Sequence, residues 1–246
     1  MTAVKTRDLC KRYVPAAPLS ALLRGRWRGD PVAALCEVSL DVQAGEALGL
    51  VGENGAGKTT LLRILAGLLL PTSGEARVMD QDVRGATAAF RARVGLLGSE
   101  DRGFSFRLTG RQNLSFFAAL HGFSGRAAHD RVARMIERVG LGDAADRRAG
   151  TYSTGMRARL SLARGLLGDP EVLLADEPTR GLDPRAAIEF RALLAGWASQ
   201  GRALIVATHD LAEARTLCSR VAVMAGGRVR AVVPPAEVAP LLGIDA

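Results

Sequence analysis

Short apolar runs alternate with stretches of helical spacing along much of the chain. Residues 47–51 form an uninterrupted apolar run, which predicts a buried strand, and residues 61–69 carry apolar side chains at helical spacing. The same order returns in the second half, with strands predicted at 172–175 and 203–207 and a helix at 185–198 between them. This alternation predicts an α/β fold built on a parallel sheet.

The remaining segments predict additions to that sheet. Residues 4–14 predict an edge strand that ends before Pro15 and Pro18, residues 38–42 a second strand, and residues 76–79 a further edge strand. Near the C-terminus we expect a hairpin and a closing helix: strands 221–224 and 229–232, the Gly226-Gly227 turn, and a short helix opened by Pro234 and Pro235.

The region from residue 90 to 150 has a different character. It is rich in arginine and in helical spacing, with candidate helices at 110–120 and 127–139. The length of 246 residues suits one α/β unit carrying such an insertion. We therefore expect a helical insertion in the α/β fold.

Composition limits the setting in which this fold works. No apolar run is long enough to cross a membrane, and the N-terminus lacks the apolar core of a signal peptide. Cys10, Cys36 and Cys218 are widely spread and match neither a disulfide framework nor metal-ligand spacing. We expect a cytoplasmic protein with reduced, inert thiols.

The net charge of +8 admits an anionic partner such as nucleic acid or a lipid surface. However, only three of the 33 basic residues are lysines, a bias that favours a compositional origin over a binding surface. One of those three is Lys58, in the glycine-rich segment at residues 52–60. A narrow ammonium fits such a segment better than a broad guanidinium. Residues 19–30 add a basic patch with Trp27, which predicts either a contact for lipid headgroups or a partner, or a solvated surface loop.

The segment at residues 52–60, GENGAGKTT, matches the phosphate-binding pattern G-x-x-x-x-G-K-[ST]. Its glycines let backbone N–H groups surround a phosphate chain, and the following helix adds the positive end of its dipole. Lys58 can reach the β- and γ-phosphates, and the Thr59 hydroxyl can bind Mg²⁺. The order of strand, loop and helix favours this P-loop over a chance glycine-rich turn.

Two acids follow the predicted strand at 172–175. Asp176 can hold Mg²⁺ through water, and Glu177 can orient and deprotonate an attacking water. Adjacent acids on an extended chain point to opposite sides, which suits two separate tasks. Acids that merely end a strand are the alternative, and the upstream P-loop argues against it.

Two further segments have both a functional and a structural interpretation. His209 follows the strand at 203–207, where it can contact a γ-phosphate or serve only the fold. Ser153, Thr154 and Gly155 precede a helix predicted at 157–167, where they offer a second anion site or simply an N-cap.

With the P-loop, YSTGM, LLADEP, GLD and THD in this order, the chain resembles the nucleotide-binding subunits of ABC transporters over nearly its whole length. The resemblance implies a RecA-like P-loop NTPase core at 1–95 and 165–246, an antiparallel β edge, and a helical subdomain at 96–164. It also implies hydrolysis of ATP with Mg²⁺ as cofactor.

Residue roles follow from the same resemblance. Tyr13 corresponds to the aromatic that stacks on adenine, and Asp183 to the acid of the D-loop. Asp176 corresponds to the Walker B acid, Glu177 to the catalytic base and His209 to the switch histidine. The nucleotide-binding set is Tyr13, Gly52, Glu53, Asn54, Gly55, Ala56, Gly57, Lys58, Thr59, Thr60, Ser153, Thr154, Gly155 and Asp183.

Two departures from the family pattern stand out. In YSTGM, Thr154 and Met156 replace the first glycine and the glutamine of the LSGGQ signature. Ser99 stands where the family has a glutamine that senses the γ-phosphate and the membrane partner. The segment that follows Ser99, DRGFSFRLTGRQNLSFFAALHG, resembles the branch of ABC exporters that serve polysaccharide, lipid-linked glycan or drug efflux permeases.

The resemblance implies a nucleotide-sandwich homodimer on the cytoplasmic face of the membrane, bound to a separate multi-spanning permease, with no nucleic-acid partner. The rival hypotheses are an ATPase that acts on nucleic acid and a regulatory nucleotide-binding protein without turnover. The compact insertion, in place of long coiled coils, argues against the first. The presence of Glu177 and His209 argues against the second.

Overall fold

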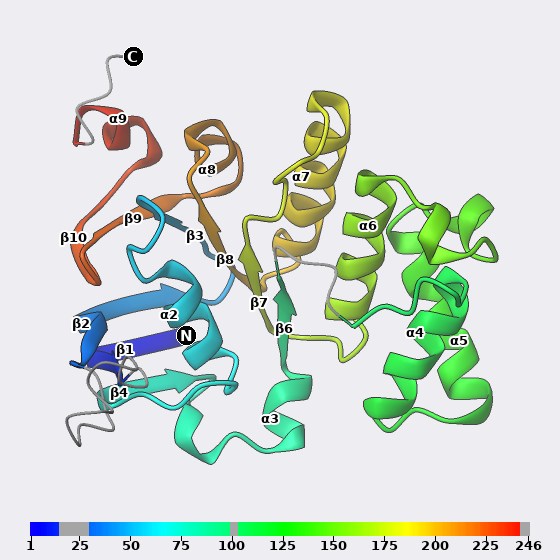
Figure 1. Cartoon of the computed structure of the whole chain (residues 1–246), viewed down its shortest axis with the longest axis horizontal. Helices are drawn as coiled ribbons and strands as arrows, with labels where there is room; N and C mark the ends of the chain where they lie inside the picture. The colour runs from blue at the N-terminus through cyan, green and yellow to red at the C-terminus, as the bar shows by residue number, and fades with distance from the viewer. Residues whose placement is uncertain (15–29, 99–102, 242–246) are drawn as a thin grey trace, which may run out of the picture.

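The computed structural model describes residues 1–14, 30–98 and 103–241. Within these ranges the strands form a four-stranded sheet and a six-stranded sheet, with helices packed around the larger one (Figure 1). The basic patch at 19–30, apart from Asp30, and Ser99 lie outside the described residues. No helix in the described part of the chain has the length and apolarity needed to cross a bilayer.

The smaller sheet is antiparallel, in the order β2-β1-β4-β5. Its strands are β1 (Thr2–Tyr13), β2 (Val32–Gln43), β4 (Ser73–Val78) and β5 (Gln81–Asp82). Because β1 pairs with both β2 and β4, the prediction of an edge strand at residues 4–14 was wrong. The prediction for residues 76–79 was wrong in the same way, since β4 also pairs with β5. Alternating burial marks which face of a strand is covered, and says nothing of how many neighbours the backbone has.

The larger sheet has the order β10-β9-β3-β8-β7-β6. Its strands are β3 (Ala47–Val51), β6 (Val94–Leu97), β7 (Val172–Asp176), β8 (Ala203–Thr208), β9 (Arg220–Ala225) and β10 (Arg228–Val233). All neighbours are parallel except β9 and β10, which form the predicted hairpin. The α/β fold with a parallel sheet is confirmed.

Strand β6 lies inside the region that the sequence assigned to the helical insertion. It pairs in parallel with β7, with Val94 opposite Val172, and forms one edge of the larger sheet. Four residues, VGLL, are too few to reveal a period. The boundary predicted between residues 95 and 96 falls inside this strand.

The helices surround the larger sheet, and α4, α5 and α6 gather at the end of the molecule away from the smaller sheet (Figure 1). The described helices are α2 (Lys58–Leu65), α3 (Ala88–Ala92), α4 (Gly110–Leu120), α5 (Gly125–Arg138), α6 (Thr154–Gly165), α7 (Pro184–Ala198), α8 (Leu211–Leu217) and α9 (Val238–Leu241). The two helices predicted in the insertion are confirmed. The helix predicted at 157–167 begins earlier, at Thr154, because Ser153 caps it.

Two hydrophobic clusters cover the two faces of the larger sheet. Along β7, Leu173 packs in the cluster that includes α4 to α8, whereas Leu174 packs in the cluster shared with α2 and the smaller sheet. This burial on both faces explains why β7 reads as a continuous apolar run. Because β3, β7 and β8 are parallel neighbours, their carboxyl ends lie along one edge of the sheet, where the candidate site residues follow.

Candidate functional site

The loop after β3 needs glycine for two physical reasons. A Cβ atom on Gly52 would lie 2.1 Å from the carbonyl oxygen of Met224, so the loop passes against the β9–β10 hairpin. Gly55 and Gly57 have φ values of 85° and 103°, in the left-handed region that side chains disfavour. Gly57 then caps α2, whose first residue is Lys58. The predicted strand, glycine loop and helix are therefore present.

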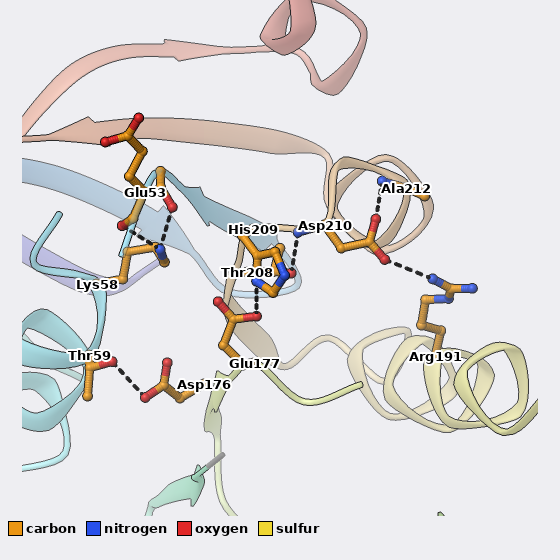
Figure 2. A network of polar contacts seen from close by, with 11 residues as sticks. Glu53, Lys58, Thr59, Asp176, Glu177, Arg191, Thr208, His209, Asp210 and Ala212 are labelled. Atoms are coloured by element: carbon orange, nitrogen blue, oxygen red, sulfur yellow. Dashed lines mark hydrogen bonds and ion pairs between the residues drawn. The ribbon is translucent and has the colours of Figure 1, made fainter. Parts of the chain in front are cut away.

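Lys58 is buried at the mouth of this loop. Its Nζ atom donates a short hydrogen bond to the carbonyl oxygen of Gly52 and another, of 3.1 Å, to that of Glu53 (Figure 2). Burial lowers the pKa of the ammonium, while the charges of Glu177 and Asp176 act in the opposite direction. A cation in this position at the glycine loop can interact with a phosphate bound there.

Thr59 and Asp176 bring the loop and the end of β7 together. The Thr59 hydroxyl donates a 2.8 Å hydrogen bond to Asp176 Oδ2 (Figure 2). Burial raises the pKa of this carboxyl, and the Thr59 hydrogen bond and the nearby Lys58 oppose the shift. Hydroxyl and carboxylate oxygens are hard ligands, and Mg²⁺ commonly takes only one or two protein ligands beside phosphate oxygens and water. The pair fits a magnesium ion bound together with a nucleotide.

Glu177 faces His209 from the neighbouring strand end. Its Oε2 atom lies 2.7 Å from Nδ1 of the ring (Figure 2). The Glu177 side chain is 11% exposed and that of His209 64% exposed. A histidine that served only the core would be buried, so this exposure favours the functional interpretation. Glu177 also has φ of 51°, an uncommon backbone conformation of the kind that clusters at functional sites.

A cleft of about 320 Å³ lies between the glycine loop and the two acids. Its lining consists of Ala34, Asn54, Gly55, Ala56, Gly57, Lys58, Thr59, Thr60, Asp176, Glu177 and Arg180. The sequence analysis missed Ala34 and Arg180. Arg180 could have been predicted from the sequence, because it follows the two acids within four residues. No local sequence feature predicts that Ala34 lines the cleft.

Tyr13 ends β1 and is not among the residues that line this cleft. It pairs with Val32 on β2, two residues before the cleft-lining Ala34. Its ring is 39% exposed and lies 5.3 Å from the ammonium of Lys11. An exposed aromatic ring in this position can stack on a planar base.

The YSTGM segment lies apart from the P-loop cleft. Ser153 Oγ accepts a hydrogen bond from the Met156 backbone N–H, so the N-cap interpretation is confirmed. Neither Ser153 nor Gly155 lines that cleft, and Thr154 lines a second cavity of about 90 Å³ that shares Glu177 and Arg180 with it. A second ligand role for this segment is compatible with the cap, because the other first-turn N–H groups of α6 remain directed along the helix axis.

Asp183, like Ser153, caps a helix and does not line the P-loop cleft. Its Oδ1 atom accepts from the Ala186 backbone N–H and caps α7, and it is likewise outside the lining of the P-loop cleft. The structure thus brings Lys58, Thr59, Asp176, Glu177 and His209 together in one chain. It places the YSTGM segment and Asp183 elsewhere.

The fold and this cleft define a P-loop nucleoside triphosphatase domain. A family model described as "ABC transporter" matches residues 35–180, more than half of the chain. The chain belongs to the ABC transporter family and is one of its ATP-binding ATPase domains.

Relatives in this family come from bacteria and animals. The chain is 36% identical to the ABC transporter ATP-binding protein NatA of Bacillus subtilis over 80% of each sequence. It is 41% identical to the daunorubicin/doxorubicin resistance ATP-binding protein DrrA of Streptomyces peucetius, over 84% of this chain and 62% of that protein. It is 37% identical to the Nod factor export ATP-binding protein I of Burkholderia lata, over 94% of this chain and 76% of that protein.

Solved structures agree on the fold. The structure of cbiO1 from Clostridium perfringens, described as part of the ABC transporter complex cbiONQ, matches with a TM-score of 0.80 at 27% identity, over 96% of this chain and 90% of that one. A dimeric, post-hydrolysis structure of the ATP-binding cassette MJ0796 with ADP and Pi matches with a TM-score of 0.81 at 24% identity, over 94% of this chain and 98% of that one.

Proposed function

We propose that this chain binds and hydrolyses ATP to power export through a separate membrane permease. The observation that carries the proposal is that Lys58, the Thr59–Asp176 pair and Glu177 line one cleft, with His209 in contact with Glu177. These groups supply the three requirements of phosphoryl transfer, namely phosphate binding, a metal site and an oriented base.

Each group has one task in this proposal. Lys58 and the loop N–H groups bind the β- and γ-phosphates, and Thr59 and Asp176 hold the Mg²⁺ that neutralises them. Glu177 orients the attacking water and accepts its proton, while His209 contacts the γ-phosphate. Tyr13 stacks on the adenine.

The position of the YSTGM segment supports a two-chain site. Ser153 and Thr154 are exposed, and neither lines the P-loop cleft of its own chain. A second copy in head-to-tail orientation would place the start of its α6 helix, with its backbone N–H groups, against the γ-phosphate. ATP would then close a homodimer around two nucleotides, and hydrolysis would reopen it.

The helical region carries the surface we assign to the permease. Phe106, Phe116 and Leu120 are large apolar side chains exposed on or just before α4. Phe116 and Leu120 are four residues apart and so share one face of α4, and exposed apolar side chains that share a face are typical of contact sites. We propose that the permease docks here, that the chain sits on the cytoplasmic face of the membrane, and that the helical subdomain begins after Leu97, where β6 ends.

The proposed cargo is inferred from the names of the relatives. They include drug-resistance proteins and Nod factor export proteins. We propose an exported glycan, lipid-linked glycan or drug-like molecule as cargo. No described residue of the cleft specifies it, since the cleft recognises the nucleotide.

The test is purification of the full chain from detergent-solubilised membranes, with mass spectrometry of what is recovered with it. A stoichiometric multi-spanning protein is the expected result. As a matched control, a variant with Phe116→Glu and Leu120→Glu should lose that partner while retaining ATP binding. Recovery with nucleic acid and no membrane protein would instead support the alternative of a nucleic-acid ATPase.

A further inference from the structure

Two of the three cysteines face each other across the smaller sheet. The register of β1 against β2 shifts between Leu9 and Lys11, so the one residue between them faces two residues of β2. That residue is Cys10, and the two that it faces are Cys36 and Glu37, the arrangement of a β-bulge. Cys10 and Cys36 are therefore neighbours in the sheet, although they are far apart in the sequence.

Both thiols lie on the outer face of this sheet. Leu9 and Leu35 are buried on its inner face. Cys10 and Cys36 follow them in their strands and so alternate to the outer face, where both are half-buried.

The backbone at the bulge has the dimensions that a disulfide needs. Cys10 Sγ accepts a 3.2 Å hydrogen bond from the Glu37 N–H, which places the sulfur against the peptide that joins Cys36 to Glu37. Opposite residues of antiparallel strands have Cα atoms about 4.5–5.5 Å apart, and a disulfide spans about 4.4–6.8 Å. A bond between the two sulfurs therefore needs side-chain rotation and only local adjustment of the strands.

Strand β10 runs beside β2 and brings a cation to the bulge (Figure 1). Arg228 Nη1 pairs with Glu37 Oε2 at 2.6 Å. The hydrogen bond to Glu37 raises the pKa of Arg228, and the nearby Cys36 and Cys10 act in the same direction. Half-exposed thiols beside a cation are typical of reactive cysteines.

Backbone hydrogen bonds connect the bulge with the nucleotide cleft. The Cys36 N–H donates 2.8 Å to the carbonyl oxygen of Gly227, and the Gly227 N–H donates 3.2 Å to the carbonyl oxygen of Ala56 in the P-loop. On β2 itself, Ala34 lines the cleft two residues before Cys36. A change at the bulge therefore reaches the cleft by two routes.

We propose that Cys10 and Cys36 form a redox-active pair whose oxidation to a disulfide weakens nucleotide binding. The S–S bond removes the proton that Cys10 donates to the Asp8 carbonyl oxygen at 3.5 Å, and it turns the sulfur away from the Glu37 N–H. The bulge then rearranges, and the change passes along β2 and through Gly227 to the cleft. Formation of the disulfide is independent of the proposed export function, whereas its effect on affinity rests on the nucleotide cleft assigned above.

A peroxide is the oxidant in this proposal. One thiolate attacks hydrogen peroxide, forms a sulfenic acid and releases hydroxide. The second thiolate attacks the sulfenic sulfur, the S–S bond forms, and a second hydroxide leaves. The two thiol protons convert the hydroxides to water, so two electrons pass from the sulfurs to one peroxide. Disulfides in reducing compartments are usually transient in this way, because cellular thiols reverse them.

The first test treats the reduced, purified full chain with hydrogen peroxide and maps the product by mass spectrometry. We expect the loss of two hydrogen atoms, a link between the peptides that contain Cys10 and Cys36, and one remaining thiol. That thiol is Cys218, which is buried and whose pKa is raised by burial to about 12. A link that includes Cys218, a link between two chains, or the persistence of both other thiols would overturn the proposal.

The second test measures the Kd for ATP by calorimetric titration before and after oxidation. Oxidation should weaken binding at least about fivefold, the lower end of typical coupling between two sites, and dithiothreitol should reverse it. Cys10→Ser and Cys36→Ser should each bind ATP as the reduced wild type does and lose the response to peroxide. Cys218→Ala is the matched control and should keep the response. A smaller change in Kd with the disulfide fully formed would overturn the effect on nucleotide binding.

The two readouts separate this inference from the proposed function. A reduced wild-type chain that binds no ATP would contradict the proposed function, and with it the effect on affinity, whatever the peptide map shows. A chain that hydrolyses ATP but forms no link between Cys10 and Cys36 would overturn the redox pair alone.

Discussion

Glu177 Oε2 lies 2.7 Å from His209 Nδ1, and this contact joins the ends of the neighbouring strands β7 and β8. With Nδ1 held by the carboxylate, Nε2 is the ring nitrogen that can meet a γ-phosphate. Glu177 thus holds one ring nitrogen of His209 and leaves the other available for the phosphate.

His209→Ala should therefore impair hydrolysis more than binding. We expect kcat to fall about 100-fold, the scale typical of a positioned acid–base group, with the Kd for ATP within about twofold. Steady-state phosphate release and equilibrium nucleotide titration measure the two quantities. His129→Ala is the matched control, because His129 is exposed on α5, and an equal loss in both variants would contradict the assignment.

Lys58 is expected to contribute to the affinity for ATP. Lys58→Ala should weaken ATP binding about 10- to 100-fold, since hydrogen bonds to charged groups contribute about 1.5–3 kcal/mol. Lys58→Arg should also weaken it, because a guanidinium fork does not match the narrow site between the Gly52 and Glu53 carbonyl oxygens. Calorimetric titration with ATP checks both variants, and Lys5→Ala on β1 is the control. ATP affinity equal to the wild type in Lys58→Ala would refute the role.

The hydrogen bond between Thr59 and Asp176 predicts how the enzyme depends on Mg²⁺. Removal of the metal by a chelator should abolish turnover. Asp176→Asn should raise the Mg²⁺ concentration needed for half-maximal activity about 10- to 100-fold, the usual cost of losing an outer-shell carboxylate. Asp146→Asn is the control, since that exposed acid pairs with Arg111 away from the cleft. An unchanged Mg²⁺ requirement in Asp176→Asn would exclude this residue from the metal site.

The sequence predicts this fold best where structure is set locally. Strand β7 is buried on both faces, so an apolar run of four or five residues was sufficient to find it. The P-loop could also be found from the sequence, because its glycines are required locally. Gly52 allows a close backbone approach, and Gly55 and Gly57 allow positive φ angles. Such features depend little on the rest of the chain.

Long-range pairing was not predictable in the same way. β1 pairs with β4, some 70 residues away, and no pattern within residues 4–14 predicts this second pairing. Ala34 lines the cleft because β2 passes beside Gly57, and Glu213 is buried only once α8 folds against the rest of the chain. In the sequence each resembles an ordinary strand or helix residue.

The separation of the YSTGM segment from the P-loop cleft predicts complementation between chains. Lys58→Ala and Ser153→Arg should each be nearly inactive alone, since each damages both sites of a homodimer. A mixture should regain part of the wild-type phosphate release, because one of the two composite sites in a mixed dimer combines an intact P-loop with an intact YSTGM segment. Mixing Lys58→Ala with Asp176→Asn, which alter the same cleft, is the control. No recovery in the first mixture would contradict a site shared between chains.

The most direct test of the account is the behaviour of Glu177→Gln with ATP. The account predicts that this variant binds ATP with a Kd within about twofold of the wild type, releases phosphate at least about 100-fold more slowly, and accumulates as a stable dimer in size-exclusion chromatography. Phosphate release at the wild-type rate would contradict the assignment of Glu177 as the base, and with it the mechanism proposed for this cleft.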